Sequence, residues 1–505
     1  MTKKIIFNFF SQIAGLLVSF LDRLVLVGIL VRVWGVDVYA DWVKLCASAG
    51  LISLCELGIG IYFGNALAMA FAEQDEDLFN RIVSTNLVIY LVIGITLLFG
   101  ATFVFFADVD QLLSIRSTSD SAKIFFVLAL AEIFHLTRGA VSQIYRGRGE
   151  FARGATIDTG VAAIKIGFGI LVASVSGTPM TMALVYAASA LIGGWGIMLF
   201  DLHRRYPHIQ FVLYRPRRST GSDIFKNVGW YALVQGTPLA WLHVPILLLG
   251  AFGYGGASLV SYVAQRTMVN FGRSIVTMLS MGMTVELTGH FHKRQFIELG
   301  RIINAMGRII ASIVGIVMSA IFCFGSILLA VWTGRSDLFD PVILFWMLTP
   351  AIIVAPALPL SGLCMYANRP QFLAVAYAVQ LGIALMLSYP MVDNFGVAGL
   401  AISLVAGEIL GIGILLPALF VGKIDFRYLP HAIECMLVSI AACSWGSLIA
   451  WLLLSTFGSP SVAKLSLVLA IWTGLAVPPV LYISLPTPHR ARLRAAFSRF
   501  LPRAC

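Results

Sequence analysis

The run IIASIVGIVMSAIFCFGSILLAV, from Ile309 to Val331, decides the fold class of this chain. It holds no charged side chain and is long enough to cross the hydrocarbon core of a bilayer as a helix. Similar runs recur along the 505 residues, of which 59% are hydrophobic and only 12% charged. The runs are continuous and not alternating, which excludes a transmembrane β-barrel. The sequence therefore predicts an all-α polytopic membrane protein.

Apolar runs separated by polar breaks predict about 14 transmembrane helices. The first run is too long for a cleavable signal peptide, so we expect it to stay in the protein. The expected spans are 9–33, 40–69, 84–106, 123–144, 154–175, 180–200, 226–250, 257–285, 301–331, 341–366, 371–391, 396–420, 429–454 and 463–485.

The basic residues are distributed unequally between the two sides of these spans. Of the 35 Lys and Arg, 23 fall in the two terminal tails and in the loops expected on the same side of the membrane as those tails. Six fall on the opposite side of the membrane, and six lie within spans. Because cytoplasmic loops carry the excess of Lys and Arg, we expect both termini in the cytoplasm. The net charge of +11 then reflects membrane topology, and we expect no nucleic-acid partner.

The two halves of the chain resemble each other, which indicates an internal duplication. Tyr145–Phe151 parallels Tyr366–Phe372 at a shift of 221 residues (366 − 145). Lobes with an even number of spans keep the same orientation, and transporters built this way hold cargo between the lobes near the membrane midplane. We expect two six-helix lobes around a central cavity, followed by two C-terminal helices. The predicted domains are an N-terminal lobe at 1–206, a basic linker at 207–225, a C-terminal lobe at 226–422, helices 13 and 14 at 423–486, and a basic cytoplasmic tail at 487–505.

Four short elements resemble Wzx-type polysaccharide flippases, of the multidrug/oligosaccharidyl-lipid/polysaccharide exporter superfamily. They are DRLVLVGILVRVWGVDVYADW at 22–42, LCELGIG at 54–60, YRGRG at 145–149 and FGVAG at 395–399. The chain departs from the pattern at Ala40, where a second glycine is usual. The resemblance covers most of the chain, and the fourteen-span layout fits it.

The resemblance implies a flippase that moves an undecaprenyl-pyrophosphate-linked oligosaccharide from the inner to the outer leaflet of the bacterial cytoplasmic membrane. Spans 1, 2, 7 and 8 would line the cavity. A polysaccharide polymerase and a chain-length regulator are the expected protein partners. The chain is then not an enzyme, and we name no catalytic residue.

Three arginines within expected cavity spans are the candidate substrate contacts. Arg23 lies in span 1, and Arg266 and Arg273 share one face of span 8. A cation at bilayer depth is costly unless it faces a partner or a wet cavity. The planar guanidinium suits a pyrophosphate or an acidic sugar. Pairing with an acid on a neighbouring span is the alternative for Arg23, and pairing with Glu56 is the alternative for Arg273.

Three further residues are candidates for ion coupling or charge balance: Glu56 in span 2, His243 in span 7 between two prolines, and Glu408 in span 12. A helix–helix hydrogen bond is an equal alternative for Glu56. The gradient would be one of H⁺ or Na⁺, and we expect no other cofactor. The seven cysteines form no CxxC pair and the histidines do not cluster near them, so we predict no metal site and no disulfide framework.

The other buried charges are predicted to be structural. Glu132, His135 and Arg138 of span 4 should join Asp158 and Lys165 of span 5 in an ion-pair network. Arg308 should lie near the membrane surface. The alternative function is a cation-coupled multidrug exporter of the same superfamily, which would favour an acidic cavity. A polymerase or ligase would need a large outer loop, and none is expected here.

Overall fold

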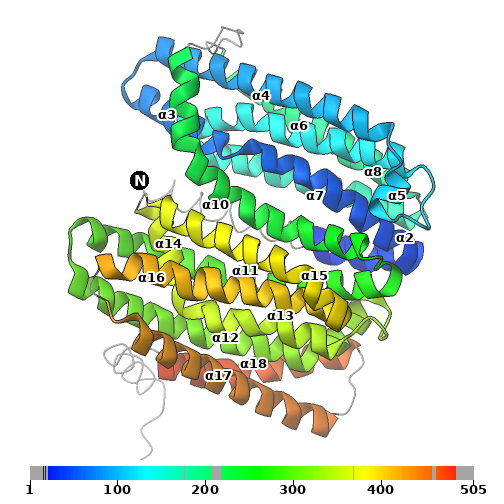
Figure 1. Ribbon diagram of the computed structural model, residues 1–505, viewed down its shortest axis with the longest axis vertical. Helices are drawn as coiled ribbons and strands as arrows, with labels where there is room; N and C mark the ends of the chain where they lie inside the picture. Colours follow the sequence, from blue (N-terminus) through cyan, green and yellow to red (C-terminus); the bar gives the residue numbers. More distant parts are fainter. Residues whose placement is uncertain are drawn as a thin grey trace, which may run out of the picture. The chain divides into compact units, whose positions relative to one another are not determined.

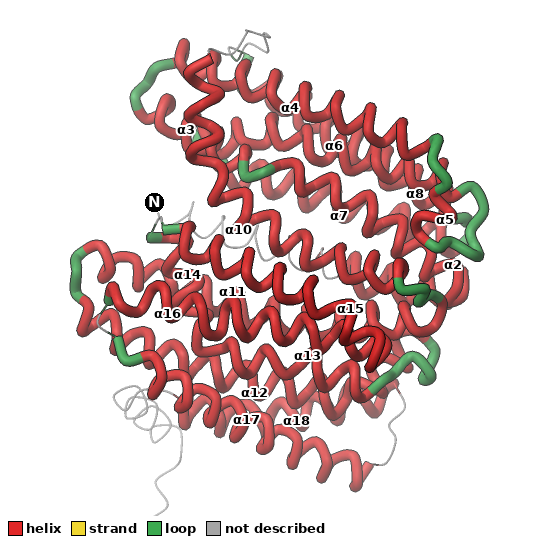
Figure 2. The backbone as a smooth tube through the Cα atoms, viewed as in Figure 1, coloured by secondary structure: helices red, strands yellow, loops and turns green. Residues whose placement is uncertain are grey.

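The computed structural model describes residues 15, 18, 21–175, 177–207, 209, 218–367, 369–424, 426–457 and 462–484. Throughout this part of the chain the regular structure is helical and no strand occurs (Figure 2). The side chain of Arg23, most of the 207–225 linker and the 487–505 tail lie outside the described residues. The prediction of an all-α membrane protein is confirmed.

The described residues contain 11 candidate membrane spans. Two of them, Leu24–Ala72 and Pro370–Phe420, are 49 and 51 residues long, and each contains a glycine with positive φ, Gly35 or Gly396. Each therefore corresponds to two expected spans. The helix Gly256–His292 supplies the remaining one, so all fourteen expected spans (11 + 2 + 1) have a helical counterpart.

The chain divides into two compact units. Unit 1 comprises Met1–Val263 with Trp332–Gly334, and unit 2 comprises Ala264–Val331 with Arg335–Cys505. The predicted lobe boundaries stay a prediction.

Unit 1 is built around helix α6, which packs against α3, α4 and α8 (Figure 1). Its helices are α2 (Val27–Gly50), α3 (Ile59–Ala72), α4 (Glu76–Phe105), α5 (Val109–Leu113), α6 (Ser121–Gly147), α7 (Phe151–Ser174), α8 (Pro179–Ala188), α9 (Ile197–Arg205) and α10 (Arg218–Ala251). A π-helical turn at Asp22–Leu26 precedes α2, a 3₁₀ segment at Leu51–Glu56 separates α2 from α3, and a second π-helical turn at Ser189–Gly196 separates α8 from α9.

Local sequence explains where several of these helices begin. Asp75 accepts a hydrogen bond from the amide of Leu78 at the start of α4, and Asp108 does the same for Gln111 at the start of α5. Such N-caps satisfy one of the amides that a helix start leaves without a partner. Thr178 caps α8, where Pro179 occupies the first turn.

Unit 2 contains most of α11 (Gly256–His292) and all later helices except the last residues of α12. These are α12 (Phe296–Thr333), α13 (Pro341–Val354), α14 (Leu358–Tyr366), α15 (Pro370–Glu408), α16 (Leu416–Phe420), α17 (Tyr428–Phe457) and α18 (Val462–Ser484). Short 3₁₀ segments lie at Ala355–Ala357 and Val421–Lys423, and a π-helical turn lies at Ile409–Leu415.

Candidate functional site

The pair of Arg273 and Glu408 is the central charged feature of unit 2. One guanidinium nitrogen of Arg273 donates to Oε2 of Glu408 at 3.1 Å, and the other donates to Oε1. The Glu408 side chain is 7% exposed and that of Arg273 is 31% exposed. Glu408 is thus the charge partner of Arg273, and the alternative pairing with Glu56 is not the one adopted.

A small cavity adjoins this ion pair. It measures about 40 Å³ and is lined by Arg273 and Thr277 together with apolar side chains of α12, α13 and α14. That volume admits a water molecule, but not a sugar. Tyr377 lies close enough to interact electrostatically with both charges. Arg273 therefore borders a small and mainly apolar cavity, and 31% of its side chain is exposed.

The other candidate substrate contacts have different surroundings. Arg266 is 8% exposed and lies seven residues before Arg273 on α11, beside Gln265, which is fully buried. For Arg23, only the backbone is described, and it forms part of the π-helical turn at Asp22–Leu26. Whether these arginines contact cargo stays a prediction.

Span 2 is interrupted by the 3₁₀ segment Leu51–Glu56. Glu56 lies within this interruption, and His243 packs against the end of the helix that precedes it. The imidazole of His243 packs on Gly50, where an added Cβ would come within 2.4 Å of its Cε1 atom. Glu56 ends the 3₁₀ segment, and its carboxylate accepts a hydrogen bond from the amide of Gly60. Their assignment to ion coupling stays a prediction.

The predicted ion pairing between spans 4 and 5 is confirmed. Arg138 of α6 pairs with Asp158 of α7, and His135 lies 3.2 Å from the same guanidinium. Lys165 of α7 lies close enough to interact electrostatically with Glu132 of α6, and its ammonium group also lies over the ring of Tyr186, 4.6 Å from the ring centre. A cation over an aromatic face is stabilised electrostatically by the ring.

Arg308 has a partner that the sequence did not indicate. Its guanidinium lies 2.6 Å from the carboxylate of Glu434 on α17, and both side chains are partly exposed. This pair ties α12 to the C-terminal helices within unit 2.

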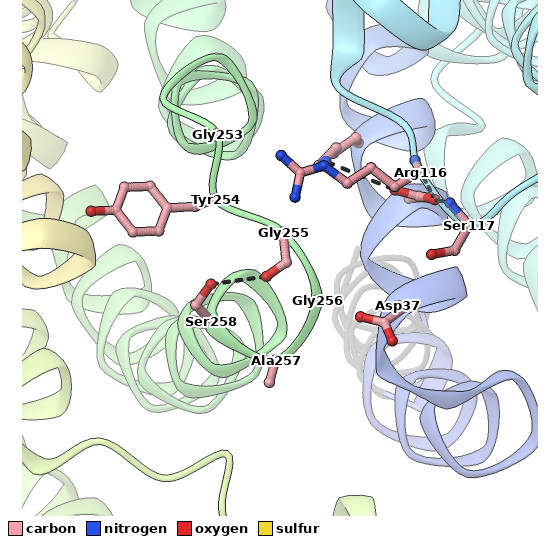
Figure 3. Close-up of a pocket in the computed structure, with 11 residues that line it drawn as sticks. Asp37, Arg116, Ser117, Gly253, Tyr254, Gly255, Gly256, Ala257 and Ser258 are labelled. Carbon is pink, nitrogen blue, oxygen red and sulfur yellow. Dashed lines mark hydrogen bonds and ion pairs between the residues drawn. The ribbon is translucent and has the colours of Figure 1, made fainter.

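A charged pocket in unit 1 was missed from the sequence. It has a volume of about 450 Å³ and lies where the turn after span 1, the loop 107–122 and the turn between α10 and α11 meet. Figure 3 shows the Arg116 guanidinium directed toward the glycine-rich turn, with Asp37 facing Gly256. The lining residues are Asp37, Asp41, Lys44, Arg116, Ser117, Gly253, Tyr254, Gly255, Gly256, Ala257 and Ser258.

Two charged side chains at this pocket are almost fully buried. Asp41 is 3% exposed and accepts hydrogen bonds from the amides of Arg116 and Ser117, at 3.2 and 2.7 Å. Lys44 is 2% exposed and donates to the carbonyl oxygen of Ser114 at 2.7 Å. These bonds fasten the loop to α2. The sequence could have indicated this pocket through the spacing of Asp37, Asp41 and Lys44, which places the three charged side chains on one face of a helix.

Within the described part of the chain, no group of three or more His, Cys, Asp or Glu side chains is placed to hold a metal ion. The six described cysteines are free thiols.

The helices and buried charges define a multi-pass α-helical membrane protein. No protein-family model matches the chain, and no curated protein matches it. Among solved structures, the lipid II flippase MurJ in its inward closed conformation is similar with a TM-score of 0.69 and 14% identity, over 96% of this chain and 98% of that one. An inward-facing multidrug resistance MATE family transporter of the MOP superfamily has a TM-score of 0.64 and 16% identity, over 80% of this chain and 95% of that one.

A further MATE structure, determined in complex with MaL6, has a TM-score of 0.60 and 16% identity, over 84% of this chain and 97% of its own. The chain therefore has the fold of this lipid II flippase and of these MATE transporters. At this level of identity the likeness concerns the fold alone, and the specific resemblance to Wzx-type flippases stays a prediction.

Proposed function

We propose that this protein is a flippase that moves an undecaprenyl-pyrophosphate-linked oligosaccharide across the bacterial cytoplasmic membrane by alternating access. The observation that carries the proposal is the extent of the likeness to the lipid II flippase, which covers 96% of this chain and 98% of the other. The two MATE structures leave 20% and 16% of this chain uncovered, although they match over nearly their own full length. A lipid-linked saccharide is therefore the favoured cargo class.

The arginines of α11 support an anionic headgroup. Arg266 is buried, and Arg273 keeps 31% of its side chain exposed although it is paired with Glu408. A pyrophosphate that approached Arg273 would compete with Glu408 for the guanidinium, because both are bidentate acceptors. Cargo binding would then free the carboxylate, which gives Glu408 a role in the transport cycle.

A multidrug exporter is the second candidate, favoured by the MATE neighbours with TM-scores of 0.64 and 0.60. The two candidates differ in the charge of the cargo. An exporter of cationic drugs would use the carboxylate of Glu408 and gain nothing from Arg266.

The test is lipid translocation by the purified protein in liposomes. A fluorescent undecaprenyl-pyrophosphate oligosaccharide is placed in both leaflets, and the fraction accessible to a membrane-impermeant quencher is followed over time. We expect the wild-type protein to move the lipid, and Arg266→Ala and Arg273→Ala to slow the movement at least tenfold. Arg301→Ala is the matched control, since Arg301 forms an exposed pair with Glu298.

Two outcomes would contradict the proposal. One is a wild-type protein that moves no lipid-linked oligosaccharide but exports cationic dyes from cells. The other is full translocation by both arginine variants, which would remove the arginines from the proposed cargo site.

A further inference from the structure

Two buried side chains of opposite charge, Asp41 and Lys44, lie at the charged pocket of unit 1. The Oδ2 atom of Asp41 accepts hydrogen bonds from two backbone amides of the loop 107–122, and its Oδ1 atom lies 3.8 Å from the Lys44 ammonium nitrogen. The side chains of Lys44 and Asp41 are 3% and 5% exposed. Because their charges compensate each other, the pair fixes the wall of the pocket without giving it a net charge.

The ammonium group of Lys44 nevertheless has donors that the protein does not use. Its one described hydrogen bond goes to the carbonyl oxygen of Ser114 at 2.7 Å, and the Asp41 oxygen at 3.8 Å is beyond hydrogen-bond distance. A protonated lysine carries three N–H donors. The Lys44 nitrogen also reaches the glycine-rich turn that lines the pocket, since a Cβ added to Gly255 would lie 3.5 Å from it. A buried ammonium group with unused donors at a cavity favours a ligand with acceptor atoms.

Two further charged side chains line the pocket, and neither is paired within the described part of the chain. Arg116 is bonded only through its backbone amide, so its guanidinium is free. The Asp37 carboxylate is also free, although it approaches Gly256 so closely that an added Cβ would lie 2.5 Å from its Oδ1 atom. Figure 3 shows both side chains directed toward the glycine-rich turn. The pocket therefore presents one free positive and one free negative side chain.

The arrangement of these charges selects the charge of the ligand. A simple anion would suit Arg116 and Lys44 but would also lie near the carboxylate of Asp37. A simple cation would suit Asp37 and leave both basic groups unused. A ligand with a phosphate and an ammonium group satisfies all three side chains, because a guanidinium binds phosphate oxygens in bidentate fashion and a carboxylate binds an ammonium group. The volume of about 450 Å³ is typical of small-molecule sites.

The surroundings of the loop 107–122 indicate where such a ligand comes from. Phe103 in the last turn of α4 is 80% exposed, and Phe106 directly after this helix is 81% exposed. Leu112 of α5, within the loop, is 64% exposed. Large apolar side chains that are exposed at the end of a membrane span are covered by lipid. The loop that carries Arg116 therefore adjoins the headgroup region of the membrane.

We propose that this pocket binds the headgroup of a zwitterionic phospholipid that carries a primary amine. The phosphate would accept hydrogen bonds from Arg116 and Lys44, and the ammonium group would donate to Asp37. A lipid bound in this way would bridge α2, the loop 107–122 and the turn between α10 and α11. The inference does not depend on the cargo, so it is tested separately from the proposed function.

The test is native mass spectrometry of the delipidated full-length protein in detergent. Phosphatidylethanolamine, phosphatidylglycerol and phosphatidylcholine with the same acyl chains are titrated one at a time. Phosphatidylglycerol lacks the ammonium group, and the ammonium group of phosphatidylcholine has no N–H donor. We expect phosphatidylethanolamine to bind to one site with a Kd about tenfold lower than either of the others, because a hydrogen bond between two charged groups is among the strong ones.

Two exposed pocket residues provide the variants. Arg116→Gln should raise the Kd of phosphatidylethanolamine about tenfold, and Asp37→Asn should remove the preference for this lipid over phosphatidylglycerol. Because both side chains are exposed, we expect both variants to fold. The matched controls are Lys123→Gln and Asp120→Asn, which change an exposed ion pair of the same loop that does not line the pocket. They should leave all three Kd values unchanged.

Three outcomes would overturn the proposal. The first is an equal Kd for the three lipids in the wild type, or a wild-type Kd for phosphatidylethanolamine in both pocket variants. The second is tighter binding of phosphatidylglycerol that Asp37→Asn does not change, which would indicate a site for anions alone. The third concerns the source of the ligand: soluble phosphoethanolamine that displaced the lipid at equal concentration would replace the membrane lipid as the ligand.

Discussion

At the scale of single residues, the ion pair between Arg273 and Glu408 should stabilise the fold of unit 2. Arg273→Ala would leave the carboxylate of Glu408 buried, with its side chain 7% exposed and no countercharge. Removing one partner of a buried pair costs about 3 kcal/mol or more, whereas removing both is often close to neutral. We expect Arg273→Ala to lower the Tm clearly, and the double variant with Glu408→Ala to regain most of the loss.

Unfolding midpoints of the two single variants and the double variant measure this coupling directly. Equal destabilisation by Arg273→Ala and by the double variant would mean that the pair does not stabilise the fold. The same variants separate stability from transport, because the double variant should fold yet still lack the guanidinium that cargo requires.

The same residues show which part of the site could be predicted from sequence. The pairing of Arg138 with Asp158 was accessible because sequential spans 4 and 5 are neighbours. The partner of Arg273 lies 135 residues away on another helix, and the spacing of residues in the sequence does not predict a contact over that separation.

At the scale of elements, helix α15 and the turn that follows it pack through glycines. A Cβ at Gly407 would lie 2.4 Å from the carbonyl oxygen of Gln380, and one at Gly411 would lie 2.6 Å from that of Ala376. The two arms of α15 on either side of Gly396 therefore approach backbone to backbone, as small residues allow in membranes. Long apolar runs predicted the two arms but not this contact.

We expect Gly411→Ala to destabilise the protein by about 2 kcal/mol or more, because backbone atoms cannot move aside as a flexible side chain can. Gly382→Ala on α15 is the matched control, since nothing lies within 4 Å of its added Cβ. That change should be neutral or slightly stabilising. Urea or SDS titrations of both variants provide the comparison, and similar midpoints would contradict the close approach.

The turn between α6 and α7 is fastened to the end of α9 by Glu150, which accepts a hydrogen bond from Arg205 at 3.0 Å. Burial alone would raise the pKa of Glu150, but the bond and the positive charges of Arg205 and Arg153 hold that pKa below its ordinary value. The stabilisation is then present above the ordinary carboxyl pKa and is lost as the pH falls through the lowered one.

We therefore expect the Tm difference between the wild type and Glu150→Gln to be constant above the ordinary carboxyl pKa of about 4.3 and to shrink as the pH falls below it. With Arg205→Gln already present, adding Glu150→Gln should cause a smaller change, because the charge of Arg153 still acts on the carboxylate. A difference that grows on acidification would show that the lowered pKa of Glu150 is wrong.

At the scale of the whole molecule, the distribution of charge predicts the orientation in the membrane. With 23 Lys and Arg expected on the side of the termini and six on the other, both termini should be cytoplasmic. The two ends of α12 provide a direct test. Lys293 precedes the helix, Ser336 follows it, and both residues are exposed.

In a cysteine-free background that retains export, we expect Ser336→Cys to react with a membrane-impermeant maleimide in intact spheroplasts and Lys293→Cys to react only after lysis. The reverse pattern would place the basic loops outside and move the charged pocket around Asp41 and Arg116 to the cytoplasmic face. The expected pattern instead places that pocket on the outer face, where a cargo that had crossed the membrane would leave. The fold alone does not distinguish the two orientations, because the same helices can span the bilayer either way, so labelling decides which end of the molecule receives the cargo.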